Sequence, residues 1–587
     1  MMPHSHCFRV ELVQQDLWLK ERLKPTRSGY NRTLCCMGGT RESILNEITA
    51  WVTNGSGSNN IYWIYGLPGI GKTSLAHSIC QTLDERNQLV GSFFCQRDDT
   101  NSSEPRNILP TLIYKLAGIS PGFRRIVAER LRSNQNLTAE SMKDTLFLDF
   151  ILSMPGQPNE HSLAFVIDAL DECGNNQSRP DILKALTDAA TLAPWLKIII
   201  TSRPEADIER FFNGLAGSSH SSYDLATDQK ANDDLRSFAH SQFESVASHW
   251  HLPTPWPEES DFNSVISRAN GLFIFIKTLV LALKQCADPE ESLKEALRGS
   301  AGTGLESLYG LYSSILKVHS NIRGFWRMIV VITTAQYRPL CKEPLAKLTG
   351  VKPNIVETLV DALSSLLYRG EGANGAIRVR HLSISDFFLS DRCHYQGDLR
   401  EAHAQQGVAC LEMMAKELRF NICKLNDSRL ANTDVKDLQS RIEENVSDAL
   451  QYSSLYWSNH LCFSPSMINR DLRALEGFFE GLYPLFWIEV LSIMGMVPIG
   501  APSLRRVMAW VRVSTGIHLH AEVILNRCRT PIRSSLGGFK TFVVSSSPST
   551  LRSLSALHTH IFQRDPFYPH SRIYQPPSVH SLLRASS

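Results

Sequence analysis

The sequence carries almost no net charge. Its 60 lysines and arginines face 58 aspartates and glutamates, a formal charge of +2 at pH 7, and the basic residues are scattered rather than gathered into long runs. Proteins that bind nucleic acid through bulk electrostatics concentrate basic residues on one face or in one run. We therefore expect no nucleic-acid partner.

Long apolar runs are also scarce. The first twenty residues include several polar ones where a secretory signal needs a continuous apolar stretch. The two most apolar windows, 271–283 and 485–501, are too short for a membrane span or are interrupted by charged residues such as Lys277 and Glu489. We expect neither export nor a membrane span, and a buried helix in the first window.

Cysteines with metal-binding spacing are missing. The chain has 13 cysteines, an odd number, at irregular spacing and without a paired CxxC motif. Disulfide frameworks use even numbers of cysteines, and many zinc sites use paired CxxC motifs. The pattern predicts free thiols in a reducing compartment, and we expect a cytoplasmic location.

Length and composition indicate several ordinary globular domains. At 587 residues the chain exceeds the size at which a single hydrophobic core keeps growing. Hydrophobic residues make up 43% and charged residues 20%, so there is enough apolar material to bury.

Short apolar strands alternate with amphipathic helices at about 40–215. The strand candidates are 61–65, 89–95, 163–167 and 197–201, with helical patterns that include 72–83, 108–116 and 182–190. This alternation predicts a parallel sheet covered on both faces by helices. Beyond residue 223 we expect mostly helices, near 230–248, 261–284, 305–318, 354–368, 408–418, 438–456 and 472–491, with a strand at 377–380.

A glycine-rich turn joins the first strand to a helix. Residues 66–73, GLPGIGKT, match GxxxxGK[ST] in the strand–turn–helix context that the mechanism of this P-loop motif requires. Backbone N–H groups of such a turn converge on phosphate oxygens, Lys72 would neutralise the β and γ phosphates, and the Thr73 hydroxyl would bind Mg²⁺. The expected nucleotide-binding residues are Gly66, Pro68, Gly69, Gly71, Lys72, Thr73 and Ser74.

An acidic residue ends a neighbouring buried strand. The strand 163–167 leads into Asp168, our candidate Mg²⁺ ligand beside Thr73. Two further carboxylates follow, and either could accept a proton from an attacking water. Glu172 is the preferred base and Asp171 the alternative. A strand that ends in a solvated acidic loop is the competing interpretation.

A basic residue follows the last predicted strand. An arginine at the carboxyl end of a strand in a doubly wound sheet lies on the ligand-binding edge. Arg203 is therefore a candidate catalytic contact to the γ-phosphate, and the alternative is an arginine that caps a carboxylate. The sequence has no Asn-Lys-x-Asp element of the kind that reads guanine, which favours adenine.

Three motifs in this order resemble the NACHT domain family of STAND signal-transduction ATPases, in the variant found in fungal proteins. They are GLPGIGKT at 66–73, FVIDALDEC at 165–173 and IIITSRPE at 198–205. Thr40 and Arg41, the helix with Trp51, and the segments 91–97 and 270–275 are also similar to that family. The resemblance covers about residues 35–460.

The resemblance implies a P-loop NTPase domain, a helical domain and a winged-helix domain, closed over ADP at rest and opened by exchange for ATP. On this basis we expect a short N-terminal segment at 1–39, the NTPase domain at 40–215, a helical domain at 216–300, a winged-helix-like domain at 301–395, a helical region at 396–520 and a poorly ordered tail at 521–587.

The resemblance also makes His381 a candidate sensor of the diphosphate. The plant-type form of this element has an aspartate directly after the histidine, where this chain has Leu382. A histidine near a helix start is alternatively a structural cap or a core residue.

The leading hypothesis is a slow ATPase that binds ATP or ADP with Mg²⁺, forms a homo-oligomer when ATP-bound and signals to a protein effector. Fungal self/non-self recognition or innate-immunity-like signalling would be the setting. A small-molecule kinase built on the same P-loop is one alternative. A non-catalytic scaffold with a residual nucleotide site is the other.

Overall fold

The chain forms two compact units in the structure, which is a computed structural model. The first comprises Met1–Ser314 with His381–Ile384, and the second comprises Ile315–Arg380 with Ser385–Ser587. The structure describes residues 4–26, 29–54, 59–97, 99, 101–133, 149–151, 153, 162–215, 220–228, 230–299, 302–335, 338–370, 375–426, 430–463 and 469–515. The predicted tail at 521–587 lies outside the described residues.

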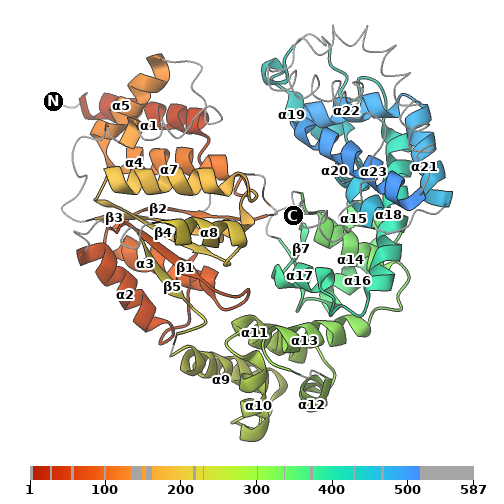
Figure 1. Ribbon diagram of the computed structural model, residues 1–587, viewed down its shortest axis with the longest axis horizontal. Helices are drawn as coiled ribbons and strands as arrows, with labels where there is room; N and C mark the ends of the chain where they lie inside the picture. Colours follow the sequence, from red (N-terminus) through yellow and green to blue (C-terminus); the bar gives the residue numbers. More distant parts are fainter. Residues whose placement is uncertain are drawn as a thin grey trace, which may run out of the picture. The chain divides into compact units, whose positions relative to one another are not determined.

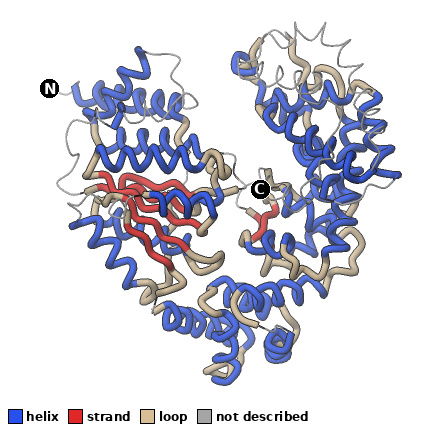
Figure 2. Tube along the Cα trace, viewed as in Figure 1, coloured by secondary structure: helices blue, strands red, loops and turns tan. Residues whose placement is uncertain are grey.

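A five-stranded sheet is the centre of the first unit (Figures 1 and 2). Its strands are β1 (Ile61–Tyr65), β2 (Leu89–Phe94), β3 (Leu163–Asp168), β4 (Leu196–Ser202) and β5 (Ser221–Asp224). They lie in the order β2-β3-β4-β1-β5, and every neighbouring pair is parallel. The four predicted strands and the parallel sheet are confirmed.

The strand β5 was not predicted. Its sequence, SSYD, has a single apolar residue and none of its residues is fully buried. It joins the sheet at an edge, where it pairs only with β1. An edge strand needs less apolar surface than a central one, so its sequence carries a weaker strand signal.

Alternate side chains of the strands build two separate cores. Trp63, Phe165 and Ile198 point into one core, and their neighbours Tyr62, Val166 and Ile199 point into the other. This is the period of two that a strand imposes. Figure 1 shows helices on both faces of the sheet.

The helices of this α/β part cover the two faces unequally. Residues of α1, α4, α5, α7 and α8 build the first core, and residues of α2 and α3 build the second. The bounds are α1 (His4–Leu23), η1 (Arg32–Leu34), α2 (Glu42–Asn54), α3 (Lys72–Glu85), η2 (Pro105–Asn107), α4 (Ile108–Ile119), α5 (Pro121–Ser133), η4 (Leu170–Glu172), α7 (Arg179–Leu192) and α8 (Ala206–Gly214).

The helix α1 was missed because its apolar residues are spread around the helix rather than gathered on one stripe. It nevertheless buries Leu19 and Leu23 in the first core.

A helical part follows the sheet within the first unit. Its elements are α9 (Ala231–Trp250), α10 (Glu259–Ala269), α11 (Phe273–Leu283), α12 (Pro289–Gly299) and most of α13 (Leu305–Lys317). The single helix predicted at 261–284 is wrong: Asn270 at φ 43° and Gly271 at φ 83° are left-handed and end α10. The predicted buried helix in the window 271–283 is confirmed as α11.

The second unit is almost entirely helical. Its elements are α14 (Phe325–Thr334), α15 (Lys342–Thr349), α16 (Pro353–Ala362), β6 (Leu367–Arg369), β7 (Ile377–Val379), most of α17 (Ser383–Leu389), α18 (Gln396–Glu417), η5 (Asn432–Asp434), α19 (Leu438–Asn445), α20 (Asp448–Phe463), α21 (Asn469–Glu480), α22 (Tyr483–Ile493), η6 (Val497–Ile499) and α23 (Gly500–Thr515). The strands β6 and β7 form an antiparallel pair. Trp457 and Trp487 are fully buried in the second unit.

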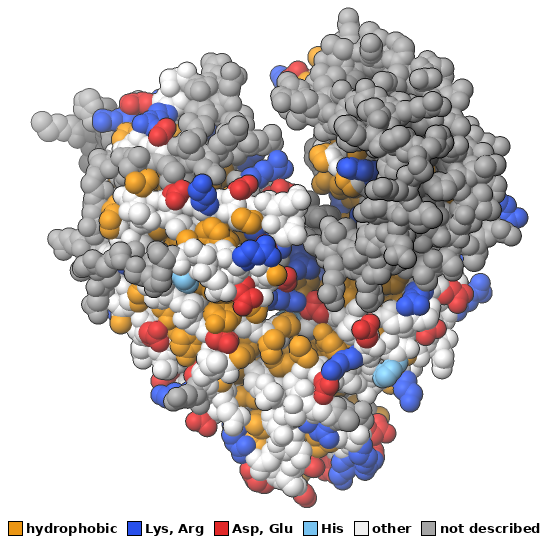
Figure 3. Space-filling view, viewed as in Figure 1, with side chains coloured by type: hydrophobic (Ala, Val, Ile, Leu, Met, Phe, Trp, Pro, Cys, Tyr) orange, Lys and Arg blue, Asp and Glu red, His pale blue; other side chains and the backbone are white. Residues whose placement is uncertain are grey.

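Charged side chains of both signs are interspersed over the visible face of the first unit (Figure 3). Among the residues that the structure describes, no helix is both long and apolar enough to cross a membrane.

Candidate nucleotide-binding site

The turn after β1 has the backbone geometry of a phosphate-binding loop. Gly69 at φ 81° and Gly71 at φ 100° are left-handed, a conformation that costs glycine little and other residues more. Gly71 caps α3 and Lys72 is its first residue, so the N-terminus of α3 opens on the turn. Pro68 lies in the turn, and Ser74 is in the first turn of α3. Free N–H groups and the helix dipole there attract anions.

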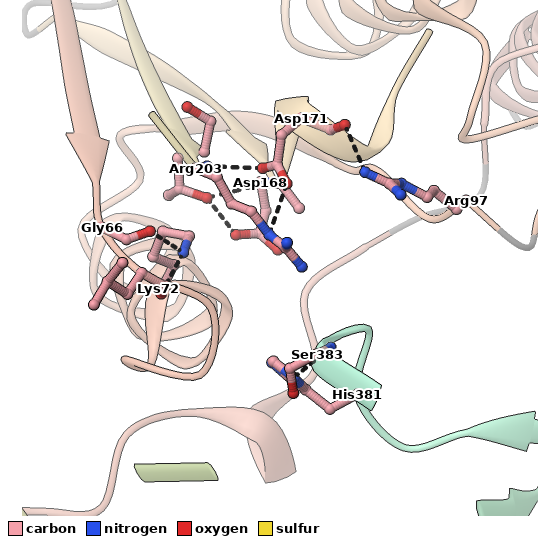
Figure 4. Close-up of polar contacts among 12 residues, drawn as sticks. Gly66, Lys72, Arg97, Asp168, Asp171, Arg203, His381 and Ser383 are labelled. Atoms are coloured by element: carbon pink, nitrogen blue, oxygen red, sulfur yellow. Dashed lines mark hydrogen bonds and ion pairs between the residues drawn. The ribbon is translucent and has the colours of Figure 1, made fainter. Parts of the chain in front are cut away.

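The Lys72 side chain is folded back into the loop. It is buried, and its Nζ donates to the carbonyl oxygens of Gly66 at 2.7 Å and Leu67 at 2.9 Å (Figure 4). Burial lowers the pKa of Lys72 to about 8, and the carboxylate of Asp171 opposes this shift. A phosphate is a stronger acceptor than these carbonyls, so the amine is placed to turn toward it.

Asp168 lies beside the loop, as predicted from the end of its strand. It is buried, it accepts a hydrogen bond from the Thr201 hydroxyl at 2.5 Å, and it also hydrogen-bonds to Thr73. Burial raises the pKa of Asp168 to about 6, although these two hydrogen bonds and the charge of Lys72 oppose the shift. Lys72, Thr73 and Asp168 therefore come together at one edge of the sheet.

The donor set suits magnesium held together with a nucleotide. Among the described residues, no group of three or more His, Cys, Asp or Glu could hold a metal ion. Mg²⁺ commonly binds through one or two carboxylates, a hydroxyl and substrate phosphates, and it keeps several waters. The carboxylate of Asp168 and the hydroxyl of Thr73 fit that pattern and would hold the ion, which would offset phosphate charge.

Thr201 was not predicted as part of the site. Its hydroxyl accepts the backbone N–H of Ala169 at 3.0 Å while it donates to Asp168. Ala169 is left-handed, with φ 54°, which is costly for a residue with a Cβ. Thr201 thus stabilises the sharp turn that ends β3. Its position on the strand β4, which lies between β1 and β3, could have indicated this role.

Asp171 binds Arg203, both of which were predicted site residues. One carboxylate oxygen of Asp171 accepts the backbone N–H of Arg203 at 2.9 Å, and the other lies 3.3 Å from its Nε (Figure 4). Asp171 is buried and Arg203 is partly exposed. Arg203 therefore pairs with a carboxylate here, as the alternative interpretation had it, and it does so at the same edge of the sheet as Lys72.

Glu172 follows Asp171 in the short helix η4 (Leu170–Glu172). Burial raises the pKa of Glu172 to about 8, and the charge of Asp171 raises it further, while Arg97 lowers it. Arg97 donates to the backbone oxygen of Asp171 at 3.5 Å. Of the two predicted base candidates, Asp171 is held in an ion pair. Glu172 has a pKa raised toward neutrality, as suits a general base.

The helical part contacts the loop directly. The backbone N–H of Ile274, at the start of α11, donates to the Gly69 oxygen at 3.2 Å. A Cβ on Gly69 would lie 2.1 Å from Cγ2 of Ile274.

An arginine also contacts the loop. The buried Arg41 donates to the Ile70 oxygen at 3.0 Å and pairs with Asp228 at 2.7 Å. The contacts of Ile274 and Arg41 with the loop were not predicted from the sequence.

His381 lies against the same loop. The segment His381–Ile384 belongs to the first unit, although both flanking stretches belong to the second. A Cβ on Gly69 would lie 3.8 Å from Cε1 of His381. Burial lowers the pKa of His381 to about 3, and the charges of Arg203 and Lys72 lower it further. The ring also caps α17, because Nδ1 accepts the backbone N–H of Ser383 at 3.2 Å.

The chain thus has the fold of a P-loop NTPase, with the loop, Lys72 and Asp168 in place. Residues 39–203 match the family model described as nephrocystin 3, N-terminal. The match spans the α/β part from before α2 to Arg203, and the greater part of the chain lies outside it. No curated protein matches the chain.

Three solved structures show a distant likeness. The Walker-type ATPase PABY2304 of Pyrococcus abyssi is 15% identical, with a TM-score of 0.32, over 62% of this chain and 99% of its own. Cdc6p from Pyrobaculum aerophilum is 13% identical, with a TM-score of 0.30, over 60% and 92%. The Aeropyrum pernix Orc1 protein in complex with DNA is 12% identical, with a TM-score of 0.28, over 61% and 94%. These similarities are too distant to indicate what the chain binds.

Proposed function

We propose that this protein is an ATP- and ADP-binding switch of the NACHT type that hydrolyses ATP slowly. The observation that carries the proposal is the meeting of four groups at one edge of the sheet. They are the Lys72 amine, the Thr73 hydroxyl and the carboxylates of Asp168 and Glu172. The first three would hold the phosphates and Mg²⁺, and Glu172 would accept a proton from water.

The contacts of the loop with the helical part favour a switch over a metabolic enzyme. A nucleotide can shift a conformational equilibrium only if it binds the two states unequally. Ile274 packs on Gly69, and His381 lies near the same glycine. Phosphates in the loop would therefore meet groups from the helical part as well as from the sheet. Two states that differ in these contacts would bind the nucleotide with different affinity.

The remaining features of the proposal come from the sequence resemblance. We propose domains at 40–215, 216–300, 301–395 and 396–520, the third of them winged-helix-like, with its β6–β7 pair as supporting observation. ATP-bound chains would form a homo-oligomer, recruit a protein effector and use no nucleic acid. We propose a cytoplasmic location, in keeping with the eleven free cysteines among the described residues.

Replacing Lys72 tests the nucleotide site itself. We expect Lys72→Ala to lose ATP and ADP binding, at least about a hundredfold in Kd, because a charged partner of the phosphates is removed. Calorimetric titration would measure this. Lys184→Ala, an exposed lysine on α7, is the matched control and should bind like the wild type. Equal nucleotide binding by Lys72→Ala and wild type would refute the site.

Replacing Glu172 tests hydrolysis separately from binding. We expect Glu172→Gln to bind ATP with unchanged affinity and to release phosphate at least about a hundredfold more slowly, as loss of a general base predicts. Glu209→Gln, an exposed glutamate on α8, is the control. An unchanged rate of phosphate release would remove Glu172 as the base but leave nucleotide binding intact.

The switch itself is tested by mass in solution. The purified protein should carry ADP. Exchange of the ADP for a non-hydrolysable ATP analogue should raise the mass of the protein in solution, as measured by light scattering. Transfer of phosphate to a metabolite would instead indicate a small-molecule kinase. Absence of any nucleotide binding would leave the scaffold alternative.

A further inference from the structure

Three side chains form a hydrogen-bonded chain that ends at His381. The Tyr312 hydroxyl on α13 lies 2.8 Å from Oγ of Ser383, and this oxygen lies 2.6 Å from Nδ1 of His381. The backbone N–H of Ser383 also donates to the same Nδ1 at 3.2 Å. Tyr312 and Ser383 are buried. All three residues belong to the first unit.

The backbone N–H fixes the direction of every bond in this chain. An amide N–H can only donate, so Nδ1 of His381 must present its lone pair. In the contact between Nδ1 and Ser383, the serine hydroxyl must therefore be the donor. Because serine has a single hydroxyl hydrogen, the contact between Tyr312 and Ser383 is then donated by Tyr312. The order is Tyr312 to Ser383 to His381.

This order determines the tautomer of the imidazole. A neutral ring carries one N–H group, and with Nδ1 occupied as an acceptor the hydrogen must be on Nε2. The pKa of His381, lowered to about 3 by burial and then by the charges of Arg203, Lys72 and Lys277, keeps the ring neutral at physiological pH.

The ring is placed to use that hydrogen in the nucleotide site. Its Cε1 atom lies 3.8 Å from where a Cβ on Gly69 would be. Cε1 is bonded to both ring nitrogens, and because Nδ1 contacts Ser383, Nε2 is the nitrogen available to a phosphate in the loop. Figure 4 shows His381 and Ser383 in the same close-up as Lys72 and Arg203. A phosphate oxygen is an acceptor, so it is attracted by an N–H group and repelled by a ring lone pair. The opposite tautomer would present the lone pair.

We propose that Ser383 and Tyr312 are positioning residues that hold His381 as a neutral Nε2–H donor to a phosphate oxygen of the bound nucleotide. The proposal rests on the proposed nucleotide-binding function and extends it. It would link α13 to the phosphates through one chain of hydrogen bonds. A rearrangement that separates Ser383 from Tyr312 would remove the support for that donor.

The tautomer is measurable without any nucleotide. Nitrogen-15 spectra of the full-length protein labelled at histidine distinguish a protonated nitrogen from an unprotonated one, and the His381 signals are those lost in His381→Asn. We expect a hydrogen on Nε2 and none on Nδ1 at pH 7. A hydrogen on Nδ1, or a charged ring with both, would overturn the proposal. Ser383→Ala removes the hydroxyl that contacts Nδ1 and should shift these signals, which identifies them even if His381→Asn folds poorly. Ser383→Thr keeps the hydroxyl and should leave them in place.

Affinity for ADP then tests the functional step. We expect Ser383→Ala and Tyr312→Phe each to weaken ADP binding about three- to tenfold, the effect of one hydrogen bond, and Ser383→Thr to restore it. Ser314→Ala removes a hydroxyl on α13 that donates to Gly310 within its own helix, and it should bind like the wild type.

The outcomes separate the two proposals. If the wild type binds ADP and both Ser383→Ala and Tyr312→Phe bind it equally well, the positioning role is overturned and the nucleotide site stands. If the wild type binds no nucleotide at all, the proposed function fails, and the positioning role fails with it even though the tautomer is still observed.

Discussion

At the scale of single residues, Thr201 serves two groups with one hydroxyl. It donates to Asp168 and accepts from the backbone of Ala169. We expect Thr201→Val, which keeps the shape, to leave both buried groups without this partner. Such a loss costs about 1–3 kcal/mol of unfolding free energy per group. The pKa of Asp168 should rise further, and urea unfolding would measure the loss of stability.

The control for Thr201→Val is a threonine with an ordinary helical contact. The Thr187 hydroxyl on α7 donates to the carbonyl of Leu183, within its own helix. We expect Thr187→Val to change the unfolding free energy by less than about 1 kcal/mol. Equal losses in the two variants would show that the hydroxyl of Thr201 has no special part in holding Asp168.

Glu172 predicts a pH dependence of hydrolysis. A general base works only when ionised, and burial raises the pKa of Glu172 to about 8. Turnover should therefore rise about tenfold per pH unit between pH 6 and 7, and the rise should slow as the pH passes 8. Steady-state phosphate release across this range would measure it. A rate that is flat from pH 6 to 9 would contradict the assignment.

The sequence predicted that Lys72, Thr73 and Asp168 lie together. Their motifs place them at the carboxyl ends of two strands or directly after one, and parallel strands end at the same edge of a sheet. The sequence did not predict the partners that orient them. Thr201, Ser383 and Tyr312 have no distinctive spacing, and their roles depend on which elements become neighbours. The same limit applied to Asp171. The order of residues along the chain could not show that its carboxylate binds Arg203.

At the scale of elements, the contact of α11 with the phosphate loop leaves no room for a Cβ at Gly69. The residue is left-handed, and an added Cβ would meet Ile274 at 2.1 Å. We expect Gly69→Ala to lower the unfolding free energy by about 1–3 kcal/mol, through backbone strain and overpacking. Nucleotide affinity should fall as well. Calorimetry and urea unfolding would measure the two effects.

A double mutant separates the two causes. Gly69→Ala with Ile274→Ala removes the 2.1 Å contact with Cγ2, leaves the Cβ of residue 274 at 2.9 Å and keeps the backbone strain. It should therefore be less destabilised than the sum of the single variants. Gly118→Ala is the matched control, since nothing lies within 4 Å of a Cβ there and the residue is helical. It should be neutral or stabilising by about 1 kcal/mol. Additive single effects would show that Ile274 does not press on the loop.

The elements that were predicted correctly have the strongest periodic signals. The four apolar strands were found because central parallel strands are buried on both faces. Breaks between helices were not predicted where apolar residues keep their helical spacing across the break. Predicted helices at 438–456 and 472–491 are each two helices, interrupted near Val446 and Gly481. Such breaks depend on local backbone geometry that apolar spacing does not encode.

At the scale of the whole molecule, the second unit carries a buried pair of histidines that should make its stability sensitive to acid. Nδ1 of His403 lies 2.8 Å from Nδ1 of His460, whose Nε2 lies 2.6 Å from the Tyr452 hydroxyl. Burial lowers the pKa of His403 to about 3, and burial together with His403 and Arg327 holds the pKa of His460 well below 6.5. Both rings are therefore neutral in the folded protein.

The unfolded chain takes up protons first as the pH falls below about 6.5, the ordinary pKa of histidine. The contribution of the neutral pair to stability is complete above that pH and is lost as the pH falls toward the folded values. Between pH 6 and 5, each histidine should lower the unfolding free energy by about 1.4 kcal/mol per pH unit. Urea unfolding at several pH values would measure the slope.

Substitutions distinguish proton uptake from a mere loss of packing. His403→Phe keeps an aromatic ring against Phe463, on which His403 is stacked, and it should reduce the acid slope by one proton. Tyr452→Phe removes a hydrogen bond to His460 but no histidine. It should lower stability equally at pH 8 and pH 5.5 and leave the slope unchanged. If His403→Phe keeps the full slope, the pair does not titrate on unfolding, and carboxylates must account for any loss of stability in acid.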